Sequence, residues 1–189
     1  MIVNGRIDRA DDSDVFEFTG QAGKTVVAEV QARRLDSPLD SVVALLDARG
    51  RVLASNDDRE DLTAGVNTHA ADSYLSAKLP ANGVYRIRIS DTSRRGGEEY
   101  GYRLRLSEPR PDFDLRVVPS SLSLPVGSTA AVTVYVARRD GFTGPIKLAL
   151  SNAPAGFSAA PVTIPANQNT ARFTVKGPAA ATPQPVALS

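Results

Sequence analysis

Apolar and polar residues alternate along much of this chain, and this period of two constrains the fold more than any other feature. In the segment TVVAEVQA the side chains of Val26, Ala28 and Val30 share one face, and Glu29 lies on the opposite, wet face. The segments VYRIRIS and YGYRLRLS repeat the pattern, with arginines alternating against apolar residues. Strands with one buried and one solvated face produce this alternation, and no segment sustains the period of a helix. The sequence therefore predicts an all-β protein.

Turn sequences interrupt the alternation at short intervals, as in GQAGK, DARGR, PANG and RRGGEE. The 14 glycines and 13 prolines of the chain suit such a turn-rich fold. A chain of 189 residues is long enough for two domains with separate cores. We predict two β-sandwiches, the first formed by residues 1–108 and the second by residues 109–189.

The predicted boundary lies in SEPRPDF, residues 107–113, where two prolines prevent a strand from running through. Beyond it, strands are predicted around FDLRVV, AAVTVYVA, IKLALS and ARFTVKG, an immunoglobulin-like pattern without the disulfide. The pattern lacks a final strand, and both ends of the chain look like cuts made through a longer protein. The predicted core residues of this domain are Val132, Val134, Val136, Ile146, Leu148, Leu150, Phe173 and Val175.

Composition and missing motifs exclude several classes of function. The chain has no cysteine, which excludes disulfides, thiolate metal sites and cysteine nucleophiles. A formal net charge of +1 implies no overall attraction to nucleic acid, and no apolar run reaches the length of a membrane span. His69 is the single histidine, and neither G-x-S-x-G nor H-E-x-x-H occurs. We therefore predict that the chain is not an enzyme.

Four segments occur in order between residues 5 and 107: GRIDRADDSDVFEFTGQAGKTV, LDSPLDSVVALLDARGRVLASNDD, DSYLSAKLPANGVYRIRISD and YGYRLRLS. With these segments the first domain resembles the bacterial pre-peptidase C-terminal domain. The resemblance implies a jelly-roll-like β-sandwich, a noncatalytic module appended to secreted peptidases and other large exported proteins. The second domain, with RRDGFTGPIKLAL, looks like the immunoglobulin-like repeats that follow such modules in bacterial surface proteins.

From this resemblance we expect an accessory module pair from a larger exported bacterial protein, acting outside the cell or at its surface. Its expected tasks are adhesion, substrate targeting or positioning of a distant domain. The expected partners are an extracellular protein or polysaccharide and the rest of the parent polypeptide, with no membrane insertion. A purely structural spacer is one alternative, and an enzyme with an unrecognised carboxylate site is another. Related collagen-binding domains expose tyrosines, whereas Tyr85 shares the face of Ile87 and Ile89, so collagen binding is not expected.

The stretch NDDREDLTAGVNTHAADS, residues 56–73, collects acidic side chains in a long loop whose ends return to adjacent strands. Calcium takes six to eight oxygen ligands, which carboxylates on irregular loops supply well. A second acidic group, DDSD, matches the D-x-D that the resemblance places before the strand VFEF. The candidate calcium ligands are Asp57, Asp58, Asp72, Asp12 and Asp14. The alternative is that both groups are solvated turns in which aspartates cap backbone N–H groups.

Arginines on two of the predicted strands suggest a basic surface. If residues 84–91 and 99–107 pair as a hairpin, four arginines share its outer face: Arg86, Arg88, Arg103 and Arg105. Like charges directly opposite one another destabilise a sheet, so we expect an acid from a neighbouring strand to interleave, with Glu17 as the candidate. This face is either a solvated, salt-bridged surface or a docking face for an acidic polymer or protein.

Overall fold

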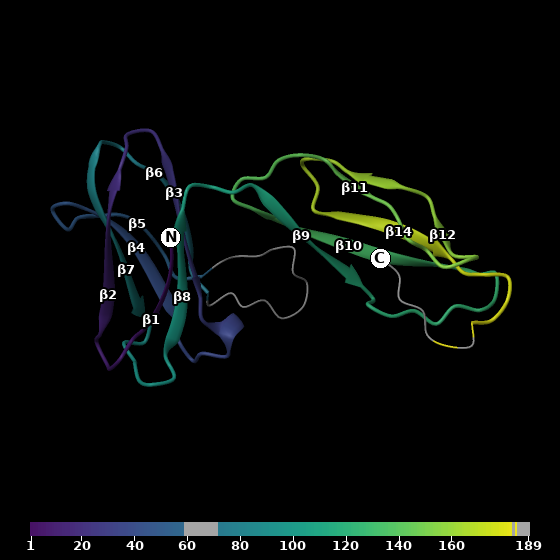
Figure 1. Cartoon of the computed structure of the whole chain (residues 1–189), viewed down its shortest axis with the longest axis horizontal. Helices are drawn as coiled ribbons and strands as arrows, with labels where there is room; N and C mark the ends of the chain where they lie inside the picture. The colour runs from purple at the N-terminus through teal and green to yellow at the C-terminus, as the bar shows by residue number, and fades with distance from the viewer. Residues whose placement is uncertain (59–71, 183, 185–189) are drawn as a thin grey trace. The chain divides into compact units, whose positions relative to one another are not determined.

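The computed structural model describes residues 1–58, 72–182 and 184 (Figure 1). Over these residues the regular secondary structure consists of β-strands and the short 3-10 helix η1 (Arg33–Leu35), which confirms the predicted fold class. In the described part of the chain no helix is long and apolar enough to cross a membrane. The chain divides into two compact units, which meet in sequence between Arg110 and Pro111.

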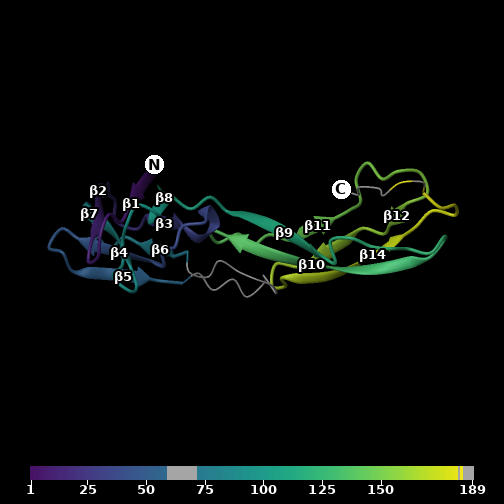
Figure 2. The ribbon, with the colours of Figure 1, turned by 90° about the horizontal axis from the view of Figure 1, so that it is seen from below.

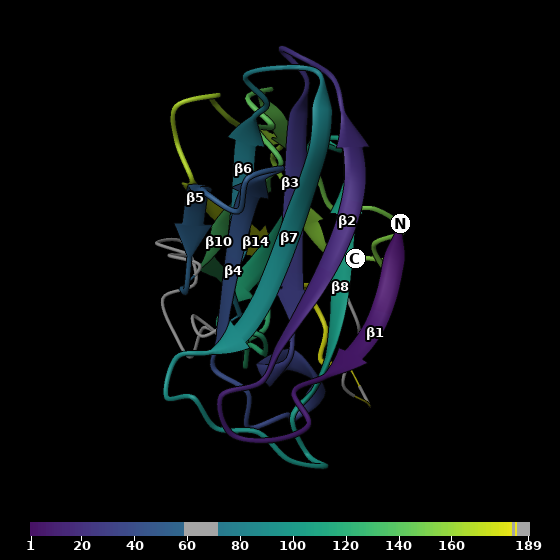
Figure 3. The same ribbon diagram turned by 90° about the vertical axis from the view of Figure 1, so that its left-hand side faces the viewer.

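The first unit is a β-sandwich of two four-stranded antiparallel sheets (Figures 1 and 3). One sheet has the order β1 (Ile2–Arg6), β8 (Gly101–Ser107), β3 (Thr25–Gln31) and β6 (Tyr74–Lys78). The other has the order β2 (Ser13–Gly20), β7 (Gly83–Asp91), β4 (Ser41–Asp47) and β5 (Val52–Asn56). Figure 3 shows this second sheet turned toward the viewer.

The core between the two sheets follows from the alternation. On β7 the side chains of Ile87 and Ile89 are fully buried, whereas Arg88 between them is exposed. On β8 the same pattern buries Leu104 and Leu106. Each fully buried side chain of this size stabilises the fold by about 1.5–3 kcal/mol. Because residues two apart share a face, the two strands present continuous apolar surfaces to each other's sheets.

Strand β3 departs from the predicted alternation. Residues 26–30 are all buried, and Glu29 is only 3% exposed. The prediction that Glu29 lies on a wet face is therefore wrong. The reason is that β3 lies inside its sheet, between β8 and β6, and arginine side chains cover the outer face at this point.

The hairpin between residues 84–91 and 99–107, on which the common arginine face depended, does not form. β7 pairs with β2 and β4, whereas β8 pairs with β1 and β3. The two strands thus belong to opposite layers, and the connection between them crosses from one sheet to the other. Alternation shows which face of a strand is buried but does not identify its neighbour, so adjacency in sequence was a poor guide here.

The second unit also consists of two sheets (Figure 2). The larger has the order β12 (Ser158–Ala159), β14 (Thr170–Lys176), β10 (Thr129–Arg139) and β9 (Asp112–Val118). The smaller pairs β11 (Ile146–Leu148) with β13 (Val162–Ile164). The predicted core residues form one cluster, in which Leu150 alone of the eight is partly rather than fully buried. β12 and β13 are too short for their alternation to be recognised in the sequence.

Candidate functional site

Asp72 lies just before β6, and its side chain is 1% exposed. Its Oδ1 atom accepts hydrogen bonds from the main-chain N–H groups of Ala32 at 2.8 Å and Arg33 at 2.7 Å. Its Oδ2 atom accepts a hydrogen bond from Nε of Arg34 at 2.6 Å. The carboxylate therefore holds the turn η1 in place, and a calcium ion would have to displace Arg34 to bind both oxygens.

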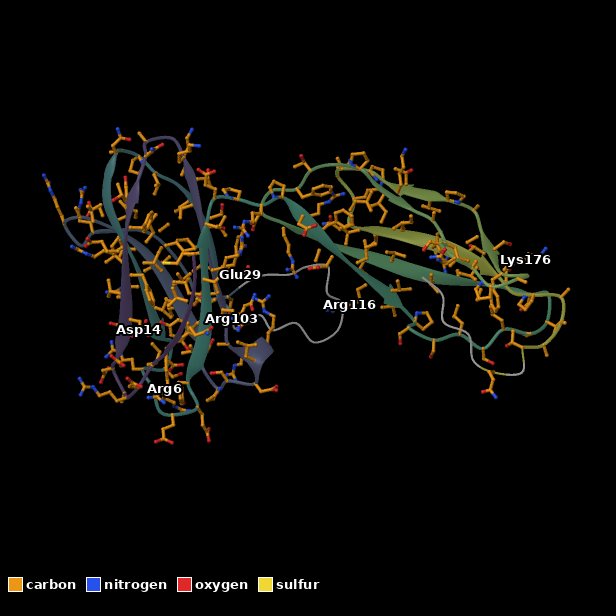
Figure 4. All side chains as sticks on the ribbon, in the orientation of Figure 1. Arg6, Asp14, Glu29, Arg103, Arg116 and Lys176 are labelled. Atoms are coloured by element: carbon orange, nitrogen blue, oxygen red, sulfur yellow. The ribbon has the colours of Figure 1, made fainter. Side chains whose placement is uncertain are left out.

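Arg34 joins Asp72 to a second buried carboxylate. Its Nη2 atom lies 3.1 Å from Oε1 of Glu29, and Nε of Arg105 lies 2.9 Å from Oε2 of the same residue. Asp72, Arg34, Glu29 and Arg105 thus form a continuous series of contacts, which we call the buried ion-pair chain. Figure 4 shows Glu29 on β3, within the first unit.

Electrostatics keep the middle of the buried ion-pair chain charged. Burial raises the pKa of Glu29, but the neighbouring charges of Arg34 and Arg105 outweigh it and hold that pKa below its ordinary value. Burial also opposes ionisation of Arg34, yet its contacts with Asp72 and Glu29 raise the pKa of its guanidinium overall. A carboxylate held this firmly between cations is suited to stabilising the fold rather than to exchanging a proton with a substrate.

The acidic loop is only partly described. Asp57 and Asp58 are exposed and follow β5 directly, while residues 59–71, which include His69, lie outside the described residues. Within the described ranges, no three aspartate, glutamate or histidine side chains are close enough together to hold a metal ion. Calcium binding at Asp57 and Asp58 therefore stays a prediction.

The second acidic group forms a turn and an interstrand contact. Asp12 accepts hydrogen bonds from the main-chain N–H groups of Asp8 and Ser13, each at 2.9 Å, as an aspartate in a capped turn does. Asp14, labelled in Figure 4, accepts a hydrogen bond of 2.5 Å from the hydroxyl of Tyr102 on β8. Burial and this carboxylate raise the pKa of Tyr102. The contact links β2, an edge strand of one sheet, to β8, an inner strand of the other.

The four arginines do not form the predicted common face, because β7 and β8 belong to different sheets. Arg86 and Arg88 lie on the outer face of one sheet, and Arg103 and Arg105 lie on the outer face of the other. The predicted acidic partner is confirmed, since Glu17 stands opposite Arg86 in register and its Oε2 lies 3.1 Å from Nη2 of the arginine.

Arg88 and Arg103 have surroundings different from those of Arg86, which contacts Glu17. Arg88 is exposed and stands in register between Val15 and Ala44. Arg103, labelled in Figure 4, is exposed and donates a hydrogen bond of 3.1 Å from Nε to Oδ1 of Asn4. Each presents a cation to solvent, but on a separate surface of the unit.

Sequence reasoning missed the buried ion-pair chain and a further buried carboxylate. Asp91 accepts hydrogen bonds from the main-chain N–H groups of Asp40 at 3.1 Å, Ser93 at 3.0 Å and Arg95 at 2.9 Å, and so fixes the turn after β7. One signal was present: Glu29 interrupts an apolar run, and a charge buried in such a run requires a partner. The sequence alone did not identify that partner.

Residues of the first unit match a known family of protein domains. The model of the bacterial pre-peptidase C-terminal domain matches residues 12–91. A probable subtilase-type serine protease of Deinococcus radiodurans is 41% identical over 80 residues, which are 42% of this chain and 10% of that protein. The chain thus matches about a tenth of this relative's length. The crystal structure of the pre-peptidase C-terminal domain of a Bacillus anthracis collagenase aligns with a TM-score of 0.41 and 13% identity, over 57% of this chain and 88% of that one.

The family match begins in the turn before β2 and ends with β7, so it lies entirely within the first unit. It includes all five aspartates of the predicted calcium groups, but not the second unit. The predicted immunoglobulin-like repeat is not tested by it. For residues 12–91, the predicted resemblance to the bacterial pre-peptidase C-terminal domain is confirmed.

Proposed function

We propose that the chain is a noncatalytic accessory and binding module pair within a larger exported bacterial protein. The observation that carries the proposal is the family match over residues 12–91. The relative named as a probable subtilase-type serine protease supports it, because the matched stretch is only 10% of that protein. A unit of this kind would act beside a catalytic domain in the same polypeptide rather than contain one.

The contacts that the buried carboxylates make support a noncatalytic role. Glu29 and Asp72 contact arginines, and Asp91 accepts three main-chain hydrogen bonds. A general acid or base needs an oxygen directed at a substrate, and a glycosidase needs two such carboxyl groups across an open site. The oxygens of these three residues are instead directed at groups of the protein itself.

The exposed faces of the first unit favour binding as its task. Arg88 and Arg103 present cations on its two outer faces, where an extracellular protein or polysaccharide could contact them. We propose adhesion or substrate targeting as the role, with positioning of a distant domain as the alternative. An immunoglobulin-like second unit would be compatible with either role.

The test combines a binding array with an activity assay. The purified chain is applied to immobilised extracellular matrix proteins and polysaccharides, beside the variants Arg88→Ala and Arg103→Ala. We expect binding that at least one variant weakens, without turnover of peptide or glycan substrates. Uniformly negative arrays would favour a spacer. Hydrolysis that survives purification and is lost in Asp14→Asn or Asp58→Asn would overturn the noncatalytic proposal.

A further inference from the structure

The second unit contains an open apolar groove of about 840 Å³. Its floor is formed by residues two apart on three strands, such as Leu115 and Val117 of β9 and Phe173 and Val175 of β14. Residues two apart on a strand share a face, so the floor is the core-facing side of the larger sheet. The groove is therefore part of the core surface that the smaller sheet leaves uncovered.

The exposed fractions of paired side chains on β9 and β10 show where the smaller sheet stops covering the larger one. Leu115 stands opposite Val136, and Val117 stands opposite Val134. The two β10 residues are 0% and 4% exposed, whereas their β9 partners are 45% and 44% exposed. All four side chains belong to the same apolar face, so the difference reflects the layer above them. That layer, β11 with β13, covers β10 but not β9.

One side of the groove is lined by β11 and by the residues that follow it. Of the residues that line this side, Lys147 and Leu148 belong to β11, and Ala149 and Leu150 directly follow it. β11 pairs with β13 on one side, and among the described residues no strand pairs with its other edge. An edge of this kind presents main-chain N–H and C=O groups that a further strand can satisfy.

We propose that this groove accepts an extended segment of a partner polypeptide, which adds to β11 as a third strand of the smaller sheet. Main-chain hydrogen bonds to the edge would give affinity, and alternate apolar side chains would pack on Leu115 and Val117. Of the described residues that line the groove, Lys147 alone is charged, so the segment carries an acidic side chain facing Lys147. This proposal goes beyond the accessory role, because it assigns a binding mode to the second unit by itself.

Two other occupants fit the groove less well. Its volume lies in the range of small-molecule sites, but an apolar small molecule would leave the edge of β11 unpaired. A second copy of the folded chain could pair its own β11 with this edge, but the apolar side chains of that strand, Ile146 and Leu148, are buried in its own core and would not pack on the floor of the groove. An extended strand satisfies both the apolar floor and the polar edge.

The test uses the full chain and a short capped peptide that alternates valine with threonine and carries one central glutamate. The matched control peptide has the same composition with its valines contiguous. Binding is followed by fluorescence anisotropy and by hydrogen exchange of the amides of residues 146–148. We expect the alternating peptide to bind more tightly than the control and to slow exchange in β11.

Two pairs of variants locate the peptide. Val117→Asp should weaken binding by about tenfold or more, since it places a carboxylate on the apolar floor. Val118→Asp on the opposite face of β9 is the control and should leave binding unchanged; both residues are already exposed enough for a charge to be tolerated. Lys147→Glu should weaken binding about two- to fivefold, and a peptide with lysine in place of glutamate should restore it.

Four outcomes would overturn the proposal. The first is no binding of the alternating peptide. The second is equal binding of both peptides, and the third is binding that leaves exchange in β11 unchanged, which would indicate an apolar ligand pocket only. The fourth is a dimer of the unmodified chain that Val117→Asp converts to a monomer, which would make a second copy the occupant.

Discussion

Arg34 organises the buried charge of the first unit, because it contacts both Asp72 and Glu29. Removing charges from water costs several kcal/mol per ion, and only close contacts with satisfied hydrogen bonds offset that cost. Here the contacts of Arg34 are 2.6 and 3.1 Å, and its side chain is 27% exposed. Loss of one carboxylate would leave the partly buried charge of Arg34 with half of its anionic partners.

Replacing Asp72 by Asn should therefore lower the free energy of unfolding of the first unit by about 2–4 kcal/mol. The amide keeps the size of the carboxylate but removes its charge from beside Arg34. Glu17→Gln is the matched control, because its pair with Arg86 is exposed on both sides, and we expect a change below about 1 kcal/mol. Urea unfolding of both variants measures the difference, and equal losses would contradict the assignment.

The pKa of Glu29 predicts a dependence of stability on pH. Since that pKa is held below its ordinary value in the folded state, the carboxylate stabilises the fold above about pH 4.3. That stability is lost as the pH falls from there through the lower pKa of the folded state. Glu29→Gln should unfold more easily at neutral pH and lose less stability than the unmodified chain between about pH 5 and pH 3. Parallel pH profiles from urea unfolding would refute this prediction.

At the scale of the elements, alternation predicted most strands but not their neighbours. It located β7, β8 and β10 because each has a long run with one apolar face. It could not show that β7 and β8 lie in opposite layers, since a period of two fixes a strand's face and leaves its partner open. The error about the arginine face followed directly from the assumed hairpin.

The pairing of elements also explains why the candidate site could not be predicted in full. Asp72 and Arg34 are separated by 38 positions in the sequence. They meet because β3 pairs with β6, with Glu29 opposite Tyr74, so that η1 and Asp72, two positions before β6, lie at the same end of the pair. Unless that pairing is known, Asp72 cannot be distinguished from the other acidic residues of the loop.

The contact between β1 and β8 depends on a glycine. A Cβ atom at Gly5 would overlap the hydroxyl of Tyr102 and lie 3.0 Å from Oδ2 of Asp14. Gly5→Ala should therefore lower the free energy of unfolding by about 1–3 kcal/mol. Gly101→Ala on the paired strand is the control, because its nearest neighbour is the carbonyl oxygen of Gly5 at 4.0 Å, and it should be neutral or slightly stabilising. Thermal unfolding of both variants tests the contrast, which similar losses would disprove.

At the scale of the whole molecule, the two units differ in how completely their cores are covered. Apolar residues from both four-stranded sheets meet in the first unit, whereas in the second the β9 side of the core face stays open. The sequence could not reveal this difference, because Leu115 and Val117 alternate in the same way as Val134 and Val136. Whether such a row is buried depends on the number of strands in the opposite layer.

Melting of the whole chain in the presence and absence of calcium tests what Asp72 does. If Asp72 acts through Arg34, Asp72→Asn should lower the melting temperature by about 10 °C or more, and by the same amount in millimolar calcium and in chelator. If calcium raises the melting temperature of the unmodified chain, that increase should persist in Asp72→Asn and disappear in Asp57→Asn or Asp58→Asn. Magnesium should have a smaller effect, since it prefers strict octahedral geometry. A calcium response that Asp72→Asn abolishes would show instead that Asp72 is a metal ligand, with Arg34 displaced from its carboxylate.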